Sequence, residues 1–343
     1  MIGAPIDVSD EVAALHQEAL VIDLHNDVLT KLSHATFDFA TRHRPAAFWN
    51  PFRLDLDLPK IRAGGIDALG CAMFAGFRLD ADRRFWRMID CARQLVDAHP
   101  QELALVDHPG ALRAARAAGR TALFLGVEGS YVVEQDLDPA IARLAAAGAR
   151  FFGPLWERNS GAGSSCRSKK DNGLTDGGRA LVAACNRHGM LIDVAHASPR
   201  TFWEMDEASE TPLFSSHSGA NGVYRHPRNL DDDQIQAIAR RGGVVGVIFV
   251  AAYLGGQFSP IAHIADHIEH VARVGGQDCV ALGSDYDGFA PLARGMRDAA
   301  DLPRLTQVLW DRGWREPALR KLLGENALRF FERTWPAALR ETA

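Results

Sequence analysis

Val21-Ile22-Asp23-Leu24-His25-Asn26-Asp27 is an apolar run that predicts a buried strand ending in two side chains of metal-ligand type. Side chains alternate between the two faces of a strand, so His25 and Asp27 are expected to point into the same space. A neutral imidazole and a carboxylate that converge in this way form half of a divalent-metal site. The alternative is a His–Asp hydrogen bond in an ordinary core, and the rest of the chain must decide between the two.

The same pattern recurs along the chain, where short apolar segments predicted to be strands alternate with amphipathic helical segments. The eight expected strands cover residues 20–25, 66–73, 121–128, 150–156, 190–196, 212–217, 243–249 and 279–285. Alternation at these spacings favours the α/β class, specifically a (β/α)8 TIM-type barrel. A doubly wound open sheet is the alternative, but it would give no reason for ligand-type residues at the ends of so many strands.

The predicted helices lie between these strands and after the last one. They are expected at residues 11–18, 81–99, 138–147, 175–189, from 199, 231–241, 261–274, 301–312 and 316–334. We predict one metal-dependent hydrolase barrel domain over 1–343, with an N-terminal helical arm at 1–18 and C-terminal helices at 301–343. The segment 31–60, with Phe48, Trp49 and Phe52, is expected to be irregular, and such long loops are usually functional. The polar, Gly/Ser-rich segment 157–174 is the other expected recognition loop.

Residues of metal-ligand type stand at the carboxyl ends of five of the expected strands, where the active site of a barrel lies. They are His25, Asp27, Glu128, His196, His217 and Asp285. Three protein ligands suffice for one catalytic zinc, so six such residues favour two metals ~3.5–4 Å apart. Glu128 is alone on its strand and suits a bridging position, and an uncoordinated carboxylate could carry a proton to the leaving amine. Taken singly, each histidine could equally be a hydrogen-bonded core residue.

Composition argues against several classes of protein. The net charge is −5 and the lysines and arginines are scattered, which argues against a nucleic-acid partner. No run of about 18 apolar residues predicts a membrane segment. The N-terminus has no recognisable signal peptide, and the five cysteines form no CxxC pair. These features predict a reducing, cytoplasmic location.

Several motifs together resemble the membrane (renal) dipeptidase family of zinc metallopeptidases, in the amidohydrolase-like superfamily. The similarity covers residues 20–335 in family order. The motifs are Asp23-Leu-His-Asn-Asp27, Gly126-Val-Glu-Gly129, Gly173-Leu-Thr-Asp-Gly-Gly-Arg179, His188-Gly-Met-Leu-Ile-Asp-Val-Ala-His-Ala-Ser198, Ser215-Ser216-His217-Ser218, His226-Pro-Arg-Asn-Leu230, Gly242-Gly-Val-Val245, Gly283-Ser-Asp-Tyr-Asp-Gly288 and Gly324-Glu-Asn-Ala-Leu-Arg-Phe-Phe331. The resemblance implies a binuclear zinc dipeptidase whose substrates carry a free C-terminal carboxylate.

The resemblance also implies a role for each metal ligand. His25 and Asp27 would bind one zinc ion, and His196 and His217 would bind the other. Glu128 and a water or hydroxide would bridge the two ions. A homodimer is a further expectation from the family.

Three other residues receive roles from the same resemblance. Asp285 would be the proton shuttle, and Arg228 would pair with the substrate carboxylate, a task that suits a bidentate guanidinium. From the residues alone, a surface salt bridge from Arg228 to Asp231, Asp232 or Asp233 would be the simpler interpretation. Trp156 stands where many relatives have a histidine thought to contact the reacting carbonyl. It is predicted to contact substrate through an indole N–H, which cannot titrate.

Two other functions stay open at this point. One is a related amidohydrolase that acts on an acyl-amino acid or a lactam with the same metal site. The other is a barrel that has lost catalysis and serves as a binding or structural module. Retention of all five expected ligands and Asp285 counts against the second.

Overall fold

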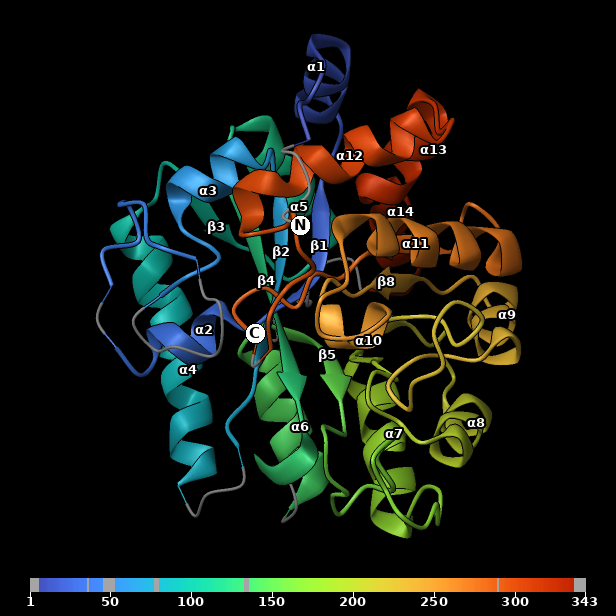
Figure 1. Cartoon of the computed structure of the whole chain (residues 1–343). Coiled ribbons are helices and arrows are strands. Elements are labelled where there is room, and N and C mark those ends of the chain that lie inside the picture. The colour runs from blue at the N-terminus through green and yellow to red at the C-terminus, as the bar shows by residue number, and fades with distance from the viewer. Residues whose placement is uncertain are drawn as a thin grey trace.

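A parallel β-sheet forms the centre of the computed structural model, which describes residues 6–35, 37–45, 53–76, 80–132, 136–288 and 290–335. The strands run in the order β6-β5-β4-β2-β1-β9-β8-β7, and β3 pairs beside the start of β4 (Figure 1). Their bounds are β1 Ile22–Asn26, β2 Ala68–Met73, β3 Leu103–Leu105, β4 Thr121–Glu128, β5 Ala149–Gly153, β6 Leu191–Ile192, β7 Ser215–Ser218, β8 Val245–Val247 and β9 Val280–Leu282.

The two ends of this strand order meet, so the sheet curls into a barrel. Asp193 and Phe214 form a parallel bridge between the segments that contain β6 and β7. The Val194 N–H donates to the Phe214 carbonyl oxygen at 2.9 Å, and the Phe214 N–H donates to that of Ile192 at 3.3 Å. The predicted barrel is therefore confirmed, and the open-sheet alternative is wrong.

Helices surround the sheet in Figure 1, and most begin and end close to the predicted bounds. The α-helices are α1 Asp10–Glu18, α2 Val28–Leu32, α3 Leu58–Ala63, α4 Ala81–Ala98, α5 Pro109–Ala117, α6 Leu137–Ala146, α7 Asp176–His188, α8 Pro199–Ala208, α9 Asp232–Arg240, α10 Ala251–Leu254, α11 Ile261–Gly275, α12 Leu302–Asp311, α13 Glu316–Arg320 and α14 Asn326–Thr334. The start of α8 illustrates why the predicted helix bounds agree with the observed ones. The Ser198 hydroxyl accepts the Thr201 N–H at 3.2 Å, and Pro199 takes the first helical position.

Some elements depart from the sequence-based expectation. The strand β3 and the helix α5 were not predicted, and β3 pairs only with the first residues of β4, whereas β5 pairs with the later ones. Three residues of strand are too few to show a period. The segment 31–60 is less irregular than expected, because α2 ends and α3 begins inside it; residues 36 and 46–52, with the aromatic residues named above, lie outside the described residues.

The expected helix 316–334 is divided by a five-residue π-helical stretch between α13 and α14. This stretch contains Gly324, where a side-chain Cβ would lie 2.4 Å from the carbonyl oxygen of Leu20. Only glycine allows the two backbones to approach so closely. The close contact sets the C-terminal helices against the start of β1.

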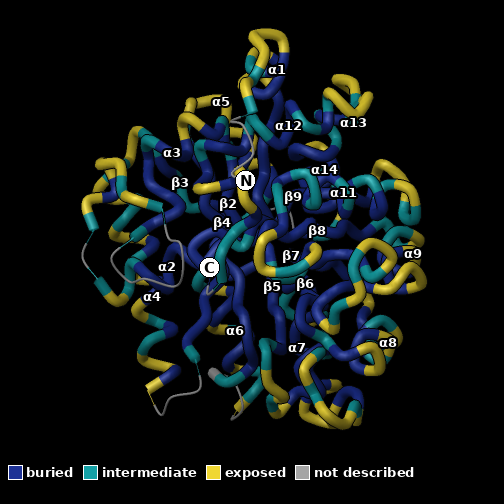
Figure 2. The backbone as a smooth tube through the Cα atoms, in the orientation of Figure 1, coloured by how far each residue is buried: buried dark blue, intermediate teal, exposed yellow. Residues whose placement is uncertain are grey.

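Aromatic side chains fill one end of the barrel. The ring of Phe124 on β4 lies 6.2 Å from that of Phe151 on β5 and 5.2 Å from that of Phe331 on α14, measured between centroids. Figure 2 shows the strands as buried and the exposed residues on the outer helices and loops. Helix α14 packs on this apolar cluster and closes this end of the barrel. Polar residues gather at the opposite end, where the strands have their carboxyl termini.

A buried ion pair between Lys31 and Asp287 connects α2 to the loop after β9. The Lys31 ammonium lies 2.9 Å from Asp287 Oδ1, and both side chains are fully buried. Asp287 also accepts the backbone N–H groups of Asp55 and Leu56 at 2.7 and 3.0 Å. The pair therefore holds three segments that are far apart in the sequence.

Lys31→Met is expected to lower the free energy of unfolding by about 3–5 kcal/mol, because it leaves the Asp287 carboxylate buried without a counter-charge. Urea unfolding followed by circular dichroism measures the change. Arg62→Met is the matched control, since Arg62 pairs with Glu102 at 3.0 Å on the exposed surface. It is expected to cost under about 1 kcal/mol. Equal losses in the two variants would contradict the structural role of Lys31.

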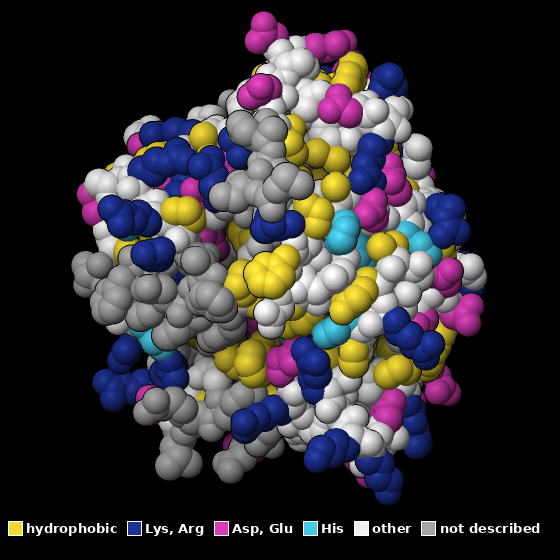
Figure 3. Space-filling view, viewed as in Figure 1, with side chains coloured by type: hydrophobic (Ala, Val, Ile, Leu, Met, Phe, Trp, Pro, Cys, Tyr) yellow, Lys and Arg dark blue, Asp and Glu magenta, His cyan; other side chains and the backbone are white. Residues whose placement is uncertain are grey.

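The surface is mixed in character. On the face drawn in Figure 3, acidic and basic side chains lie mostly around the periphery, and hydrophobic side chains lie nearer the middle. Among the described residues, no helix is both long enough and apolar enough to cross a bilayer.

Candidate metal centre

The structure brings all six residues of predicted metal-ligand type to the carboxyl ends of the strands. They arrive from five separate strands of the sheet. His25 lies in β1, Asp27 follows it as the N-cap of α2, Glu128 ends β4, His196 follows β6, His217 lies in β7 and Asp285 follows β9.

A local irregularity in β1 directs His25 into the site. Ile22 and Leu24 pack in the apolar cluster inside the barrel, so strict alternation would place Asn26, not His25, on the inner face. The pairing of β1 with β2 shifts between Asp23 and Asn26. Such a shift re-aims the side chains that follow it. His25 lies beside Asp27 and Glu128, but simple alternation along the strand is not the reason.

Two groups of candidate ligands share Glu128. One consists of His25, Asp27 and Glu128, and the other of Glu128, His196 and His217; in each, the ligand atoms lie within 4.8 Å of one another. Glu128 Oε1 lies 3.0 Å from His196 Nε2, 3.6 Å from His217 Nε2 and 3.9 Å from His25 Nε2. One carboxylate oxygen therefore faces three imidazole nitrogens.

Burial keeps the three imidazoles neutral. Desolvation lowers the pKa of His25 to about 3, with a further contribution from the positive charge of Arg228. Desolvation also lowers the pKa values of His196 and His217 well below the ordinary value. Neutral imidazole is the form that binds a metal ion.

The three carboxyl groups experience the opposite effect. Burial raises the pKa of Asp27 to about 7. Burial also raises the pKa values of Glu128 and Asp285 well above the ordinary range, and the negative charge of Asp27 adds to both shifts. The side chains of Asp27 and Asp285 are also hydrogen-bonded to each other. Three crowded acidic groups beside three neutral imidazoles form an environment that a divalent cation would stabilise.

Unpartnered buried atoms support the same conclusion. His25 Nε2 and Asp27 Oδ1 are buried and have no hydrogen-bond partner among the described residues. Buried polar atoms are rarely left in this state. A cation bound between imidazole and carboxylate would satisfy both atoms, so the residues present fit a metal.

Arg228 lies inside the protein beside this centre. It is 2% exposed, and its guanidinium donates to the Ser218 hydroxyl at 3.0 Å and to the His217 carbonyl oxygen at 2.7 Å. Its Nε has no hydrogen-bond partner among the described residues. A cavity of about 240 Å³ is lined by Arg228 and also by His196. The interpretation of Arg228 as one half of a surface salt bridge is therefore wrong.

Trp156 lies close to His196 at the edge of the centre. Its ring stacks on Phe74 with centroids 4.6 Å apart, and its centroid lies 6.3 Å from that of His196. Trp156 lines a small cavity of about 30 Å³ together with Asp27 and Asp285. The residue that replaces the expected histidine is thus within reach of a substrate at the metal ligands.

Sequence reasoning missed two residues that line the same small cavity, Glu157 and Tyr253. Glu157 Oε1 lies 3.7 Å from His196 Nδ1, while its Oε2 accepts the Arg167 Nε–H at 2.6 Å. A signal for Glu157 was present, since a carboxylate directly follows the end of a strand. No such signal marks Tyr253, because it enters the site from α10, a helix of four residues.

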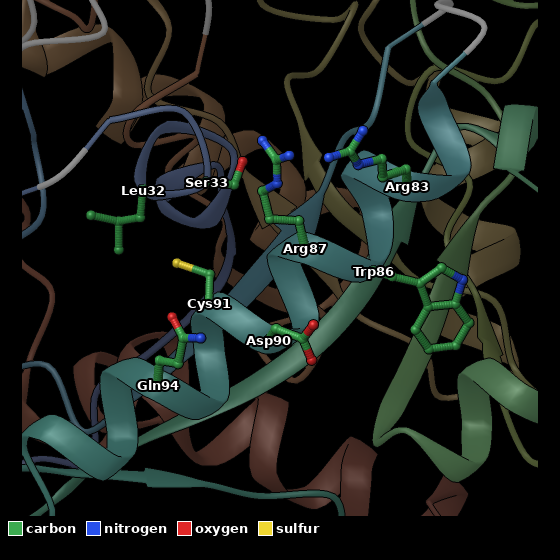
Figure 4. A pocket seen from close by; sticks show the side chains of 8 residues that line it. All are labelled: Leu32, Ser33, Arg83, Trp86, Arg87, Asp90, Cys91 and Gln94. Atoms are coloured by element: carbon green, nitrogen blue, oxygen red, sulfur yellow. The ribbon is translucent and has the colours of Figure 1, made fainter.

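Another hollow among the described residues lies near the surface between α2 and α4, away from the candidate ligands (Figure 4). Its volume is about 530 Å³, and its lining includes Arg83, Arg87, Asp90 and Cys91. Figure 4 shows the guanidinium groups of Arg83 and Arg87 close together in this view, one helical turn apart on α4, and Trp86 also lines the hollow. This hollow contains none of the converging metal ligands, so the chemistry belongs to the smaller polar site.

Comparison with known proteins places this geometry in a family. The model of the membrane dipeptidase family, peptidase family M19, matches residues 9–342. A dipeptidase described as an M19 metallopeptidase is 27% identical, with a TM-score of 0.83 and coverage of 92% of this chain and 99% of its own. A metallopeptidase from Rhodobacter sphaeroides, liganded with a phosphinate mimic of the dipeptide L-Ala-D-Ala, is 25% identical, with a TM-score of 0.83 and the same coverage.

A third structure, an amidohydrolase from Pseudomonas aeruginosa, is 25% identical, with a TM-score of 0.79 and coverage of 94% of this chain and 99% of its own. The predicted fold, metal use and metallo-dipeptidase activity agree with the family match and are confirmed. The chain belongs to the membrane dipeptidase family, peptidase family M19.

Proposed function

We propose that the chain is a binuclear zinc dipeptidase that hydrolyses dipeptides with a free C-terminal carboxylate. The observation that carries this proposal is the pair of three-residue ligand groups that have Glu128 in common. A shared carboxylate between two such groups is typical of sites that hold two metal ions close together. The likeness to a metallopeptidase liganded with a dipeptide mimic supports the substrate class.

In this proposal His25 and Asp27 hold one zinc ion, His196 and His217 hold the other, and Glu128 contributes to both. When bound, two zinc ions would lower the pKa of a bound water, so that hydroxide forms near neutral pH, and would polarise the scissile carbonyl. The protein keeps the imidazoles neutral by burial, and the carboxylates stand directly after β1 (Asp27) and at the end of β4 (Glu128). The sheet therefore fixes the distances between ligands before any ion binds.

Asp285 is proposed to carry the proton to the leaving amine. Its backbone φ is +62°, a left-handed conformation that non-glycine residues rarely adopt and that is common at functional sites. Its side chain contacts that of Asp27 and lines the small cavity with Glu128 and His217. A carboxyl group whose pKa is raised by burial can hold a proton near neutral pH and release it during the reaction.

Arg228 and Trp156 are proposed to bind the substrate. The Arg228 Nε–H, together with the guanidinium hydrogens not used by His217 and Ser218, can donate to a carboxylate. Trp156 offers an indole N–H and an apolar ring above the small cavity. A carboxylate anchor beside His196 and an aromatic ring close to the metal ligands would favour a substrate only two residues long.

A substrate panel tests this function directly. We expect zinc-loaded protein to hydrolyse members of a dipeptide library much faster than N-acyl-amino acids or lactams of similar size. Faster turnover of an acyl-amino acid or a lactam would favour the related amidohydrolase activity. Turnover of none of the three classes would favour a barrel without catalysis.

Two zinc ions per chain are expected in protein purified without chelator, measured by inductively coupled plasma mass spectrometry. His196→Gln should reduce the content to about one ion, because it removes one of three ligands from one group. His188→Gln is the control, since His188 lies 3.3 Å from Asp138 away from the site and should leave both ions bound. A parent protein that stays near zero after zinc is supplied would contradict the two-metal proposal.

Three expectations from the sequence stay predictions. They are the single domain over 1–343, the homodimer and the cytoplasmic location. Sedimentation equilibrium of the purified protein would measure the oligomeric state.

A further inference from the structure

Ser216 lies between two of the proposed metal ligands. It is fully buried in β7, and its hydroxyl oxygen lies 3.0 Å from His25 Nδ1 and 2.7 Å from His217 Nδ1. The two imidazoles stand side by side, with ring centroids 3.6 Å apart and planes inclined by 30°. One hydroxyl therefore meets the inner nitrogen of both rings.

A carboxylate on the neighbouring strand segment anchors this hydroxyl. Asp193 Oδ2 lies 2.5 Å from Ser216 Oγ, and Asp193 Oδ1 accepts the backbone N–H groups of Ser216 and Ala195, each at 2.9 Å. Asp193 is itself 2% exposed. These contacts bind the serine to the place where the barrel closes between β6 and β7.

The hydrogens in this cluster can be counted. A serine hydroxyl has one hydrogen to donate and two lone pairs to accept with. The hydrogen goes to Asp193 Oδ2, which lies 2.5 Å away, while Asp193 Oδ1 already accepts two backbone N–H groups. Both lone pairs then accept, so His25 and His217 each carry their hydrogen on Nδ1. The lone pair of each ring is consequently on Nε2, the nitrogen that faces Glu128.

We infer that Ser216, anchored by Asp193, is a positioning residue that holds His25 and His217 with Nε2 free for metal binding. This inference rests on the proposed binuclear function, in which the two histidines bind different ions. Partners behind the ligands of a metal orient the rings and select the tautomer, and their loss typically weakens metal binding 10–100-fold. Because one hydroxyl serves both rings, its removal should weaken both metal sites together.

A second Asp–Ser pair in the barrel shows what the same hydrogen bonds do without an imidazole. Asp23 accepts the Ser284 backbone N–H at 2.7 Å and the Ser284 hydroxyl at 2.6 Å, which joins β1 to the end of β9. The Ser284 hydroxyl also lies 3.2 Å from the backbone carbonyl oxygen of His25, and no contact between it and an imidazole ring is found among the described residues. Strand joining therefore accounts for Ser284, whereas Ser216 has two further contacts that strand joining does not need.

Ser216→Ala tests the inference through zinc affinity, measured for each site by titration against a competing chelator. We expect both dissociation constants to rise by roughly 10–100-fold, since both rings lose the acceptor for Nδ1–H. Thr306→Val is the matched control, because the Thr306 hydroxyl lies 2.7 Å from Nδ1 of His16, a buried histidine outside the metal centre. It removes a hydroxyl–imidazole hydrogen bond of the same kind and should leave both zinc affinities within a few-fold of the parent.

The outcomes separate the inference from the proposed function. If the parent binds two zinc ions and Ser216→Ala binds both with the same affinity as the parent, the role of Ser216 is overturned but the proposed function is not. A loss at one site only would overturn the shared role. A parent that binds no zinc would overturn the proposed function and this inference with it.

A measurement on the parent protein covers the case in which Ser216→Ala does not fold. In zinc-loaded protein labelled with ¹⁵N-histidine, nuclear magnetic resonance should show His25 and His217 protonated on Nδ1 and bound to zinc through Nε2. A hydrogen on Nε2 with zinc bound through Nδ1 in either ring would overturn the inference.

Discussion

Asp285→Asn is expected to reduce kcat for dipeptides by ~10²–10⁴-fold, the usual contribution of a general acid–base group. The amide has nearly the same size as the carboxyl group but cannot take up and release the proton. Both zinc ions should stay bound, because the proposed metal ligands are other residues. Steady-state kinetics together with metal analysis of the same sample measures the two effects.

Asp278→Asn is a suitable control for this prediction. Asp278 lies just before β9, pairs with Lys321 at 2.9 Å and is far more exposed than Asp285. The control should retain the activity of the parent. Activity of Asp285→Asn within a few-fold of the parent would remove Asp285 from the mechanism, and loss of a zinc ion would show that it acts as a ligand.

Arg228→Met is expected to lower kcat/KM for a dipeptide by roughly ten- to a hundred-fold or more, since hydrogen bonds to charged groups contribute ~1.5–3 kcal/mol. The structure strengthens the case, because the guanidinium is buried and its Nε has no hydrogen-bond partner among the described residues. A partner carboxylate left without this cation in a desolvated site would be costly. The effect should be far smaller for the same dipeptide with an amidated C-terminus, itself a poor substrate for the parent.

The neighbouring Arg225 provides the control. It is exposed, three residues before Arg228, so Arg225→Met changes the net charge of the protein by the same amount without touching the cavity. Its kcat/KM should stay within a few-fold of the parent for both substrates. Equal losses for the free and the amidated dipeptide in Arg228→Met would make Arg228 structural, held by Ser218 and His217 alone.

The sequence by itself determined the barrel and pointed to the candidate metal ligands, because both depend on local patterns. Short apolar runs that alternate with helices specify parallel strands, and active sites of such barrels lie at the carboxyl ends of the strands. Glu128 and His217 could therefore be assigned to one site although their strands are far apart in the chain. Ser198 and Pro199 likewise marked the start of a helix from chemistry that acts within a few residues.

Only the tertiary structure decided how these residues act together. The shift in β1 that directs His25 inward depends on pairing with β2, and strand pairing has no signature within β1 itself. Burial of Arg228 excluded a surface salt bridge that the adjacent aspartates made plausible. The hydroxyl of Ser216 joins two histidines because β1 and β7 approach each other inside a closed barrel. Contacts of this kind require three-dimensional closure, so no pattern along the chain predicts them.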